Sequence, residues 1–326
     1  MAPTRVAAID CGTNTIRLLI ADAHPDGGPT GRRLEKVERR SRIVRLGQGV
    51  DRTGRLDDGA LERTLDVVAD YAERIRATGA QRARFVATSA TRDASNRDLF
   101  VNGVRKRLGI EPEVVSGDEE ARLSFAGSLL GARGEGRRLV VDLGGGSTEL
   151  VLGARAPEAA ISLDTGSVRV TERYLADGVT PAAEAAARAH VRELLDRAEE
   201  VMDLGATEEL VGLAGTITTI TAHALRLSDF DPDSIHGSRL PLGTILASCE
   251  AILRSTAAER ESWDYLRPGR RDVIAAGALV WSEVIGRVAE RTREAGRPLE
   301  SAVTSLTDIL DGIALSLVEG GADRHD

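Results

Sequence analysis

The sequence contains the same short pattern twice. In each copy an apolar run ends in an aspartate, a turn rich in glycine and hydroxyl residues follows, and a second apolar run comes after it. Two apolar runs around such a turn are typical of a β-hairpin whose tip carries amides and hydroxyls. Asp10 and Asp142 hold equivalent places 132 residues apart, which predicts two related domains. The first copy occupies residues 5–10, 11–15 and 16–21, and the second residues 138–142, 143–148 and 149–152.

Length and charge are compatible with this division. The 326 residues suffice for two domains of roughly 150 residues each. Residues 1–133 carry a net charge of +4, whereas residues 134–326 carry −12. Broad binding of a nucleic-acid duplex needs a wide cationic surface. We therefore expect no nucleic-acid partner, although a local groove could still hold an anion.

The sequence argues against three further classes of protein, namely membrane, secreted and zinc-finger proteins. The longest uncharged run, residues 210–225, is too short and too rich in threonine for a membrane span. The first ten residues lack the apolar segment of a signal peptide. Cys11 and Cys249, with five scattered histidines, provide neither a disulfide framework nor the spacing of a zinc cluster. We expect a cytoplasmic protein without a membrane partner.

The two glycine turns predict a phosphate-binding site. Glycine lets backbone N–H groups approach a phosphate closely, and neighbouring hydroxyls add donors. The aspartate at the end of each first strand would repel a phosphate, so it belongs there if it binds a magnesium ion or positions water. One such turn alone is a weak signal, but two related turns favour phosphate binding.

Other phosphate-binding and hydrolytic motifs are missing. A Walker A loop needs Gly-Lys followed by Ser or Thr, but Lys36 follows Glu35 and Lys106 follows Arg105. The short Gly-x-Gly segments at 47–49 and 134–136 lack the third glycine of a dinucleotide fingerprint. Ser147 is not flanked by the two glycines of a nucleophile elbow.

Several stretches resemble the exopolyphosphatase/guanosine pentaphosphate phosphohydrolase (Ppx/GppA) family, which belongs to the actin-like ATPase superfamily. The two phosphate motifs of that family are similar to residues 8–15 and to Val141-Asp-Leu-Gly-Gly-Gly-Ser-Thr-Glu-Leu150. The Ser-Gly-Asp-Glu-Glu-Ala element at 116–121 separates this branch from the kinases of the superfamily. The resemblance extends from about residue 5 to about residue 315. Further matching stretches lie at 87–96, 115–122, 212–219 and 268–274.

The resemblance implies a role for each motif residue. Glu120 becomes the catalytic base, and Arg92 matches an arginine that binds substrate phosphate through its guanidinium fork. Mg²⁺, the expected cofactor, is bound directly or through water by Asp142 and Glu149, with Asp10 contributing from the other domain. The residues expected to bind phosphate are Gly12, Thr13 and Asn14 on one side and Gly144, Gly145, Gly146, Ser147 and Thr148 on the other.

Physical reasoning alone leaves two interpretations of Glu120. A glutamate near a metal-bound phosphate can take a proton from an in-line water, and phosphoryl transfer otherwise needs mainly positioning and charge neutralisation. Alternatively, Asp118, Glu119 and Glu120 simply favour the N-terminus of a helix. The family also usually has serine where Thr13 and Thr15 stand; threonine keeps the hydroxyl and slightly crowds the loop.

Two other features have alternative interpretations. The arginines at 39, 40, 42 and 45 could guide a polyanionic chain, with Arg40 and Arg42 on one face of a strand, or they could lie on a solvated edge strand. Backbone dipoles in the first turn could lower the pKa of Cys11, but plain packing is the favoured interpretation.

The expected fold is α/β, with two actin-like (ribonuclease H-like) domains and a cleft between them. Each domain is expected to have a five-stranded mixed sheet with flanking helices. The first domain covers residues 1–131 and the second 132–303, with a hinge near 131–136. The C-terminal segment 304–326, including a helix at 304–318, returns to the first domain. Further helices are expected at 56–78, 96–108, 118–130, 181–204, 242–257 and 271–290.

These observations lead to one main functional hypothesis. The chain is expected to be an exopolyphosphatase that releases terminal orthophosphate from inorganic polyphosphate, with Mg²⁺ bridging the terminal phosphates and Glu120 activating water. Hydrolysis of pppGpp in the same cleft, an ATP-dependent kinase and a non-catalytic sensor of phosphorylated ligands remain alternatives. The expected partners are inorganic polyphosphate or guanosine penta- or tetraphosphate, and a second copy in a homodimer. Larger family members add a C-terminal HD-type domain, and this chain stops before it.

Overall fold

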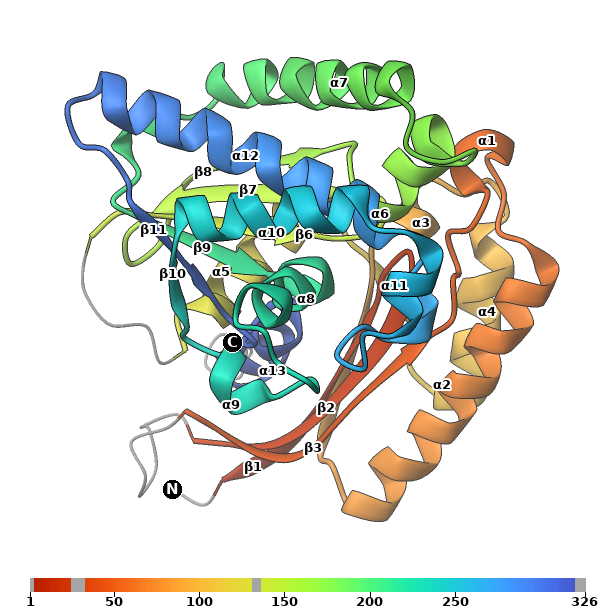
Figure 1. Cartoon of the computed structure of the whole chain (residues 1–326). Helices are drawn as coiled ribbons and strands as arrows, with labels where there is room; N and C mark the ends of the chain where they lie inside the picture. The colour runs from red at the N-terminus through yellow and green to blue at the C-terminus, as the bar shows by residue number, and fades with distance from the viewer. Residues whose placement is uncertain (1–2, 25–32, 131–135, 320–326) are drawn as a thin grey trace. The chain divides into compact units, whose positions relative to one another are not determined.

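The fold consists of two α/β units. Figure 1 shows the computed structural model of the chain, which describes residues 3–24, 33–130 and 136–319. One unit comprises Met1–Gly131 with Thr307–Asp326, and the other comprises Ala132–Leu306. Apart from Gly136, the linker expected at residues 131–136 lies outside the described residues.

The first unit is built on a five-stranded mixed sheet in the order β3-β2-β1-β4-β5. β2 pairs antiparallel with β1 and β3, whereas β4 runs parallel to β1 and β5. The strands are β1 (Thr4–Cys11), β2 (Thr15–Ala23), β3 (Leu34–Ile43), β4 (Arg82–Ala87) and β5 (Glu113–Val114). The helices are α1 (Val50–Thr53), α2 (Asp58–Thr78), α3 (Ser89–Arg92), α4 (Arg97–Leu108), α5 (Gly117–Ser128) and α13 (Ile309–Glu319).

Both faces of this sheet are buried, because successive side chains of a strand point to opposite faces. Along β1, Ile9 and Cys11 join a hydrophobic cluster with residues of α2 and α4. Val6 and Ala8 join a second cluster, to which α13 contributes Leu310. The sheet is therefore a middle layer between two layers of helices, as expected for this α/β fold.

The second unit repeats the topology of the first and adds one strand. Its sheet has the order β10-β11-β9-β6-β7-β8. Five of these strands, taken across the sheet as β8-β7-β6-β9-β11, correspond to β3-β2-β1-β4-β5 of the first sheet. The strands are β6 (Arg138–Leu143), β7 (Thr148–Gly153), β8 (Pro157–Leu163), β9 (Glu209–Leu213), β10 (Arg239–Pro241) and β11 (Ser301–Thr304). The helices are α6 (Ser167–Val170), α7 (Pro181–Glu199), α8 (Ala214–Ala224), α9 (Pro232–Ile235), α10 (Leu242–Arg254), α11 (Ala257–Glu261) and α12 (Ile274–Glu294), with a π-turn at Thr171–Leu175 and 3₁₀ turns at Leu204–Ala206 and Pro268–Arg270.

The expectation of five strands in the second sheet was wrong by one. β10 pairs antiparallel with β11 at the edge of the sheet. It has only three residues and ends at Pro241, which cannot donate to a ladder and is tolerated at an edge. So short a segment carries too little alternation to be recognised in the sequence.

The C-terminal helix begins later than residue 304. Residues Ser301–Thr304 alternate between half-buried and buried side chains and form β11. The helix starts after Asp308, whose side chain accepts a hydrogen bond from the Leu310 N–H at 3.0 Å. The Asp311 side chain reaches back to the Asp308 N–H, also at 3.0 Å. These reciprocal bonds satisfy amides that a helix start leaves open.

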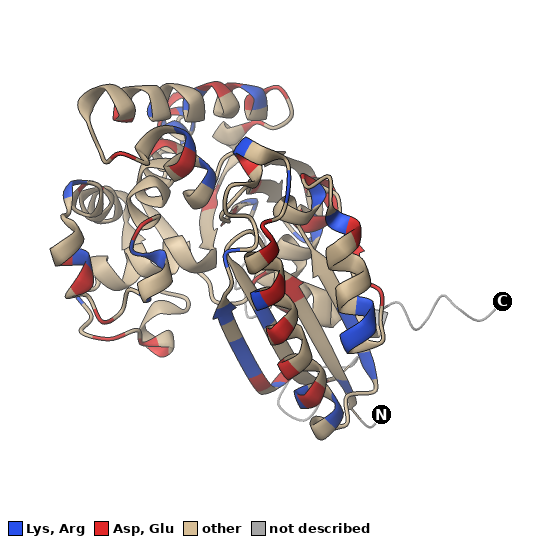
Figure 2. Ribbon diagram, turned by 90° about the vertical axis from the view of Figure 1, so that its right-hand side faces the viewer, with Lys and Arg blue, Asp and Glu red and all other residues tan. Residues whose placement is uncertain are grey.

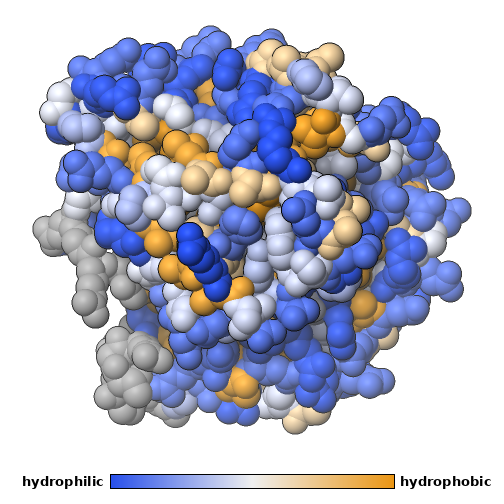
Figure 3. All heavy atoms as spheres, viewed as in Figure 1, coloured by the Kyte–Doolittle hydropathy of each residue, from blue (hydrophilic) through white to orange (hydrophobic). Residues whose placement is uncertain are grey.

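The surface is mixed in polarity and charge. Within the described residues, no helix combines the length and the apolar character needed to cross a membrane. Hydrophobic residues on the face in Figure 3 form small areas separated by hydrophilic ones, which is ordinary for a protein surface. Figure 2 shows acidic and basic residues interspersed along the helices in view.

Candidate active site

The carbonyl groups of the second glycine turn are hydrogen-bonded to residues of the segment that follows β8. The Gly144 carbonyl accepts a hydrogen bond from the Ser167 N–H at 3.0 Å, and the Gly145 carbonyl accepts from the N–H groups of Val168 and Arg169 at 2.9 and 3.0 Å. The Arg169 guanidinium donates to the Gly146 carbonyl at 2.6 Å. With these carbonyls bonded, the turn keeps its shape without the help of a ligand.

Consecutive amides of the same turn are left open. Gly144 N–H donates to the Ser147 carbonyl at 3.0 Å, which closes the turn. The next three N–H groups, those of Gly145, Gly146 and Ser147, make no hydrogen bond to any described residue. Successive free amides in a turn form a concave anion-binding site. Thr148 contributes differently, because its hydroxyl donates to the Thr165 carbonyl at 2.7 Å and helps to fix the turn.

The first glycine turn has the same closing bond. Gly12 N–H donates to the Thr15 carbonyl at 3.0 Å, in the place of the Gly144–Ser147 bond. The Thr13 carbonyl accepts from Gly47 N–H at 2.8 Å, and the Asn14 carbonyl accepts from the N–H groups of Val44 and Arg45 at 3.0 Å. The turn is therefore also anchored through its carbonyls, by the segment that follows β3.

The threonine at position 13 is accommodated by a glycine. Its hydroxyl lies 2.8 Å from the Ser89 hydroxyl, and its methyl group occupies space beside Gly47, where a Cβ would come within 2.4 Å of it. The crowding expected from threonine in place of serine is thus absorbed by Gly47, which has no side chain.

The acid that precedes each turn has a different neighbour in the two units. In the second unit Asp142 lies opposite Glu149 across the antiparallel β6–β7 pair, and both side chains are buried. Like charges directly opposite each other are unfavourable. The Glu149 carboxylate also accepts a hydrogen bond from the Ser162 hydroxyl at 2.7 Å. Two carboxylates on one face are the kind of donor set that Mg²⁺ uses together with phosphate oxygens and water.

In the first unit the corresponding acid, Asp10, is bound by an arginine. Arg17 lies opposite Asp10 in the β1–β2 pair and donates to its carboxylate at 2.8 Å. Arg17 also pairs with Asp308, and Arg39 pairs with Asp308 and Asp311 at 3.0 and 2.9 Å. Burial raises the pKa of Asp10 in spite of Arg17. Against the effect of burial, the two arginines lower the pKa of Asp308.

Metal binding by three or more protein side chains is not preformed. Across residues 3–24, 33–130 and 136–319, no group of three His, Cys, Asp or Glu side chains is arranged to hold a metal ion. A magnesium ion at Asp142 and Glu149 would need oxygen ligands from a substrate and from water, which is how Mg²⁺ commonly binds in phosphoryl-transfer sites.

Glu120 and Arg92 meet in the first unit. Arg92 Nη1 lies 3.2 Å from Glu120 Oε2 and 3.0 Å from the Val115 carbonyl. Glu120 is only 7% exposed, although it lies in the first turn of α5, where acids are usually solvated. The N-cap of α5 is Ser116, whose side chain accepts from the Glu119 N–H. Glu120 is therefore not the capping residue of α5, and its carboxylate is held by an arginine.

Similarity to known proteins identifies the family. A profile described as "Ppx/GppA phosphatase family" matches residues 22–294. Exopolyphosphatase 2 of Mycobacterium tuberculosis (strain CDC 1551 / Oshkosh) is 46% identical over 325 residues, which cover 97% of this chain and 99% of that protein. The chain belongs to the Ppx/GppA phosphatase family. This confirms the resemblance seen in the two glycine turns, and the protein is a hydrolase of the phosphatase type.

Solved structures of the Ppx/GppA family share the fold. The crystal structure of an exopolyphosphatase-like protein superposes with a TM-score of 0.92 at 42% identity, covering 97% of this chain and 98% of that one. The Ppx/GppA family member of Aquifex aeolicus gives a TM-score of 0.78 at 28% identity over 99% of both chains. The expected actin-like α/β fold is confirmed.

A second activity occurs among the Ppx/GppA relatives. The guanosine-5'-triphosphate,3'-diphosphate pyrophosphatase of Vibrio vulnificus (strain YJ016) is 36% identical over 217 residues. These residues cover 66% of this chain and 42% of that protein.

The arginines at 39, 40 and 45 have different surroundings. Arg39 is paired with the two aspartates of α13 and its N-terminal flank, and Arg40 pairs with Glu38. Arg45 has a left-handed backbone, with φ of 54°. β3 is an edge strand, as one of the two interpretations expected. Guidance of a polyanion by these arginines stays a prediction.

Cys11 is a packing residue. It is 1% exposed, and burial followed by the nearby Asp10 raises its pKa well above the usual range. The alternative, a pKa lowered by the turn, was wrong, because removal of the thiolate from water outweighs the dipoles of the turn.

Two arginines near the glycine turns were missed in the sequence. Arg169 binds the Gly146 carbonyl, as described above. Arg270 lies against Gly215 in the first turn of α8, since a Cβ on Gly215 would come within 2.1 Å of its guanidinium. The signal for Arg270 was its place in the matched stretch 268–274; Arg169 had no recognisable signal, because its role depends on the local fold.

Proposed function

We propose that the protein is an exopolyphosphatase that releases orthophosphate from the end of inorganic polyphosphate by attack of water. One observation carries the proposal: three consecutive open amides, at Gly145, Gly146 and Ser147, adjoin a buried pair of opposed carboxylates, Asp142 and Glu149. Amides bind the phosphate oxygens, and carboxylates suit the cation that such a substrate carries.

Asp142 and Glu149 are proposed as magnesium ligands. A bound Mg²⁺ would neutralise charge on the phosphates during transfer. Glu149 is positioned for this role by Ser162, whose hydroxyl occupies one side of its carboxylate. Asp10, already bound by Arg17, would contribute through water.

The groups of the first unit are proposed to bind the same substrate. Gly12, Thr13 and Asn14 would hold phosphate at the first turn. Glu120 would take the proton from the attacking water. Arg92, which holds Glu120 at 3.2 Å, would orient this base and bind a phosphate oxygen with its remaining N–H groups.

A second candidate is removal of the 5'-phosphate from pppGpp. The similarity to the Vibrio vulnificus enzyme favours it, and the chemistry at the glycine turns would be the same. The exopolyphosphatase is preferred because the Mycobacterium tuberculosis relative aligns over almost the entire length of both chains. A cytoplasmic location and a homodimer stay predictions.

The test is a comparison of substrates for the purified chain in Mg²⁺ and in EDTA. Orthophosphate release is measured from short and long polyphosphates, pppGpp and ATP. We expect release from polyphosphate that requires Mg²⁺ and exceeds release from the two nucleotides. Faster release from pppGpp would favour the second candidate, and no release from any substrate would reject both.

A further inference from the structure

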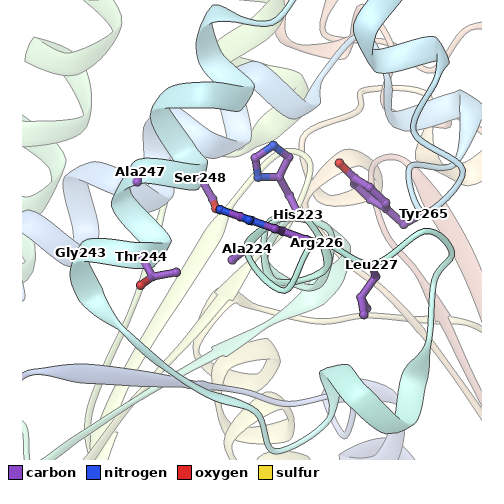
Figure 4. A pocket seen from close by; sticks show the side chains of 9 residues that line it. All are labelled: His223, Ala224, Arg226, Leu227, Gly243, Thr244, Ala247, Ser248 and Tyr265. Atoms are coloured by element: carbon purple, nitrogen blue, oxygen red, sulfur yellow. The ribbon is translucent and has the colours of Figure 1, made fainter.

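A pocket of about 690 Å³ lies in the second unit, and no residue of the glycine turn at 143–148 lines it. Sites for small organic molecules usually have volumes of roughly 300–1,000 Å³. The pocket is formed at the C-terminal end of α8, whereas Ala214 and Gly215 lie at the N-terminal end of that helix. At ~1.5 Å per residue, the nine residues from Ala214 to His223 separate the two by about 14 Å. The lining residues are His223, Ala224, Arg226, Leu227, Gly243, Thr244, Ala247, Ser248 and Tyr265 (Figure 4).

The pocket contains one unpaired cation and no acid. The Arg226 guanidinium makes no hydrogen bond or ion pair with any residue that the structure describes, whereas its backbone N–H donates to the His223 carbonyl at 3.0 Å. In Figure 4 its side chain extends toward Ser248. Its backbone is left-handed, with φ of 56°, a conformation that is uncommon for a residue with a side chain and that tends to occur at functional sites. The lining is therefore suited to an anion.

Hydroxyl groups of α10 face the same space. Thr244 and Ser248 are one helical turn apart and line the pocket together. Hydroxyls in helices commonly bond to a backbone carbonyl one turn earlier, as Thr219 does with the Gly215 carbonyl at 2.7 Å. Thr244 and Ser248 make no such bond to the described residues, so both hydroxyls can donate to a ligand.

The opposite wall is aromatic. Tyr265 stacks on Trp263 with ring centroids 5.9 Å apart and planes 15° from parallel. His223 and Trp263 form a T-shaped pair with ring centroids 5.2 Å apart. The His223 Nδ1 atom is buried without a hydrogen-bond partner among the described residues, and burial lowers the His223 pKa. His223 therefore adds aromatic surface to this wall.

We propose that this pocket binds a small organic anion with one phosphate group on a flat ring system, such as a nucleoside monophosphate. The phosphate is bound by Arg226, Thr244 and Ser248, and the ring lies against Tyr265 and Leu227. The proposal does not depend on the exopolyphosphatase activity, because no residue of the glycine turns lines the pocket.

The test is calorimetric titration of the full chain in EDTA, which suppresses magnesium-dependent binding at Asp142 and Glu149. The probes are AMP and GMP, with adenosine, guanosine and inorganic phosphate for comparison. We expect one molecule of a nucleoside monophosphate per chain, bound at least tenfold more tightly than either nucleoside or phosphate alone. Tryptophan fluorescence should change on binding, because Trp263 supports the aromatic wall.

Two variants locate the binding site. Arg226→Gln should weaken binding at least tenfold, and Ala247→Phe should fill the pocket from an exposed position without disturbing the fold. Arg197→Gln, on an exposed part of α7, and Glu120→Gln should leave binding unchanged. The proposal would be overturned if Arg226→Gln and Ala247→Phe bound the nucleoside monophosphate as tightly as the wild type does. It would also be overturned if the wild type bound a nucleoside or inorganic phosphate as tightly as the monophosphate, or bound no monophosphate at millimolar concentration.

Discussion

Asp142 lies directly opposite Glu149 across β6 and β7, at the place where Asp10 lies opposite Arg17 across β1 and β2. The two hairpins share their register and the hydrogen bond that closes each glycine turn. They differ in the residue that stands opposite the acid. In the first hairpin this residue is an arginine, which pairs with Asp10, whereas in the second it is a glutamate. The proposed cation site is therefore in the second hairpin.

Replacement of Asp142 by Asn should abolish the stabilisation that Mg²⁺ gives. A cation that binds only the folded state raises its melting temperature, and an amide is a weaker ligand for Mg²⁺ than a carboxylate. The measurement is thermal unfolding in EDTA and in a series of Mg²⁺ concentrations.

Asp177→Asn, at an exposed site of the same unit, is the control and should behave as the wild type. An equal Mg²⁺-induced shift in Asp142→Asn and the wild type would contradict the assignment of the ion to this pair.

Gly47→Ala should destabilise the first unit, and Thr13→Ser should restore part of the loss. The new Cβ would lie 2.4 Å from the Thr13 methyl and 2.8 Å from the Ala90 Cβ. Overpacking of this kind costs about 1–3 kcal/mol. The double-mutant cycle, followed by denaturant unfolding, should therefore show a coupling of at least ~0.5 kcal/mol. Additive effects would mean that the methyl group does not determine the need for glycine at position 47.

Gly312→Ala should destabilise the protein by about 3 kcal/mol or more. In the packing of α5 against α13, a Cβ at this position would lie 1.9 Å from the Leu123 carbonyl oxygen. A backbone atom cannot move aside as a side chain can, so the two helices would separate. Because α5 carries Glu120, activity should fall as well.

Gly286→Ala is the matched control for this substitution. Gly286 lies within α12 and has open space where a Cβ would stand. Alanine is favoured over glycine inside a helix by about 1 kcal/mol, so this variant should be as stable as the wild type or more stable. Similar losses in both variants, measured by denaturant unfolding, would reject the close approach of α5 and α13.

Both cysteines should resist thiol reagents in the folded protein. Burial raises the pKa of Cys249 to about 12 and that of Cys11 well above its usual range. The thiolate, which is the reactive form, is therefore scarce at pH 7–9. Unfolded cysteines ionise near pH ~8.5, so their contribution to stability is complete below that pH and is lost as the pH rises toward 12.

The measurement is the rate of reaction with a chromogenic disulfide at pH 7, 8 and 9, with and without denaturant. Rapid reaction without denaturant would contradict the burial of at least one of the two thiols.

Features with a local signal were predictable from the sequence. The duplicated turns predicted the two hairpins, because an acid, glycines and hydroxyl residues between two apolar runs are typical of a β-hairpin. The helix that carries Glu120 was expected at 118–130 and is observed at Gly117–Ser128. In contrast, β10 has three residues and was not recognised.

Features that depend on contacts distant in sequence were not predictable. Arg17 holds Asp10 and Asp308, which are 7 and 291 residues away from it. The role of Gly47 depends on the threonine at position 13 and appears only when the segment after β3 folds onto the turn. The sequence therefore indicates which residues carry the chemistry, whereas the fold determines which partners hold them.

The most direct test of the account compares binding with turnover in Glu120→Gln. Polyphosphate binding and orthophosphate release are measured in Mg²⁺ for the wild type, for Glu120→Gln and for the control Glu119→Gln, which changes the neighbouring glutamate in the same helical turn. If Glu120 is the base, its variant should bind polyphosphate within a few-fold of the wild type, while release falls by roughly 10²–10⁴ and the control stays active. Undiminished release by Glu120→Gln would contradict the account.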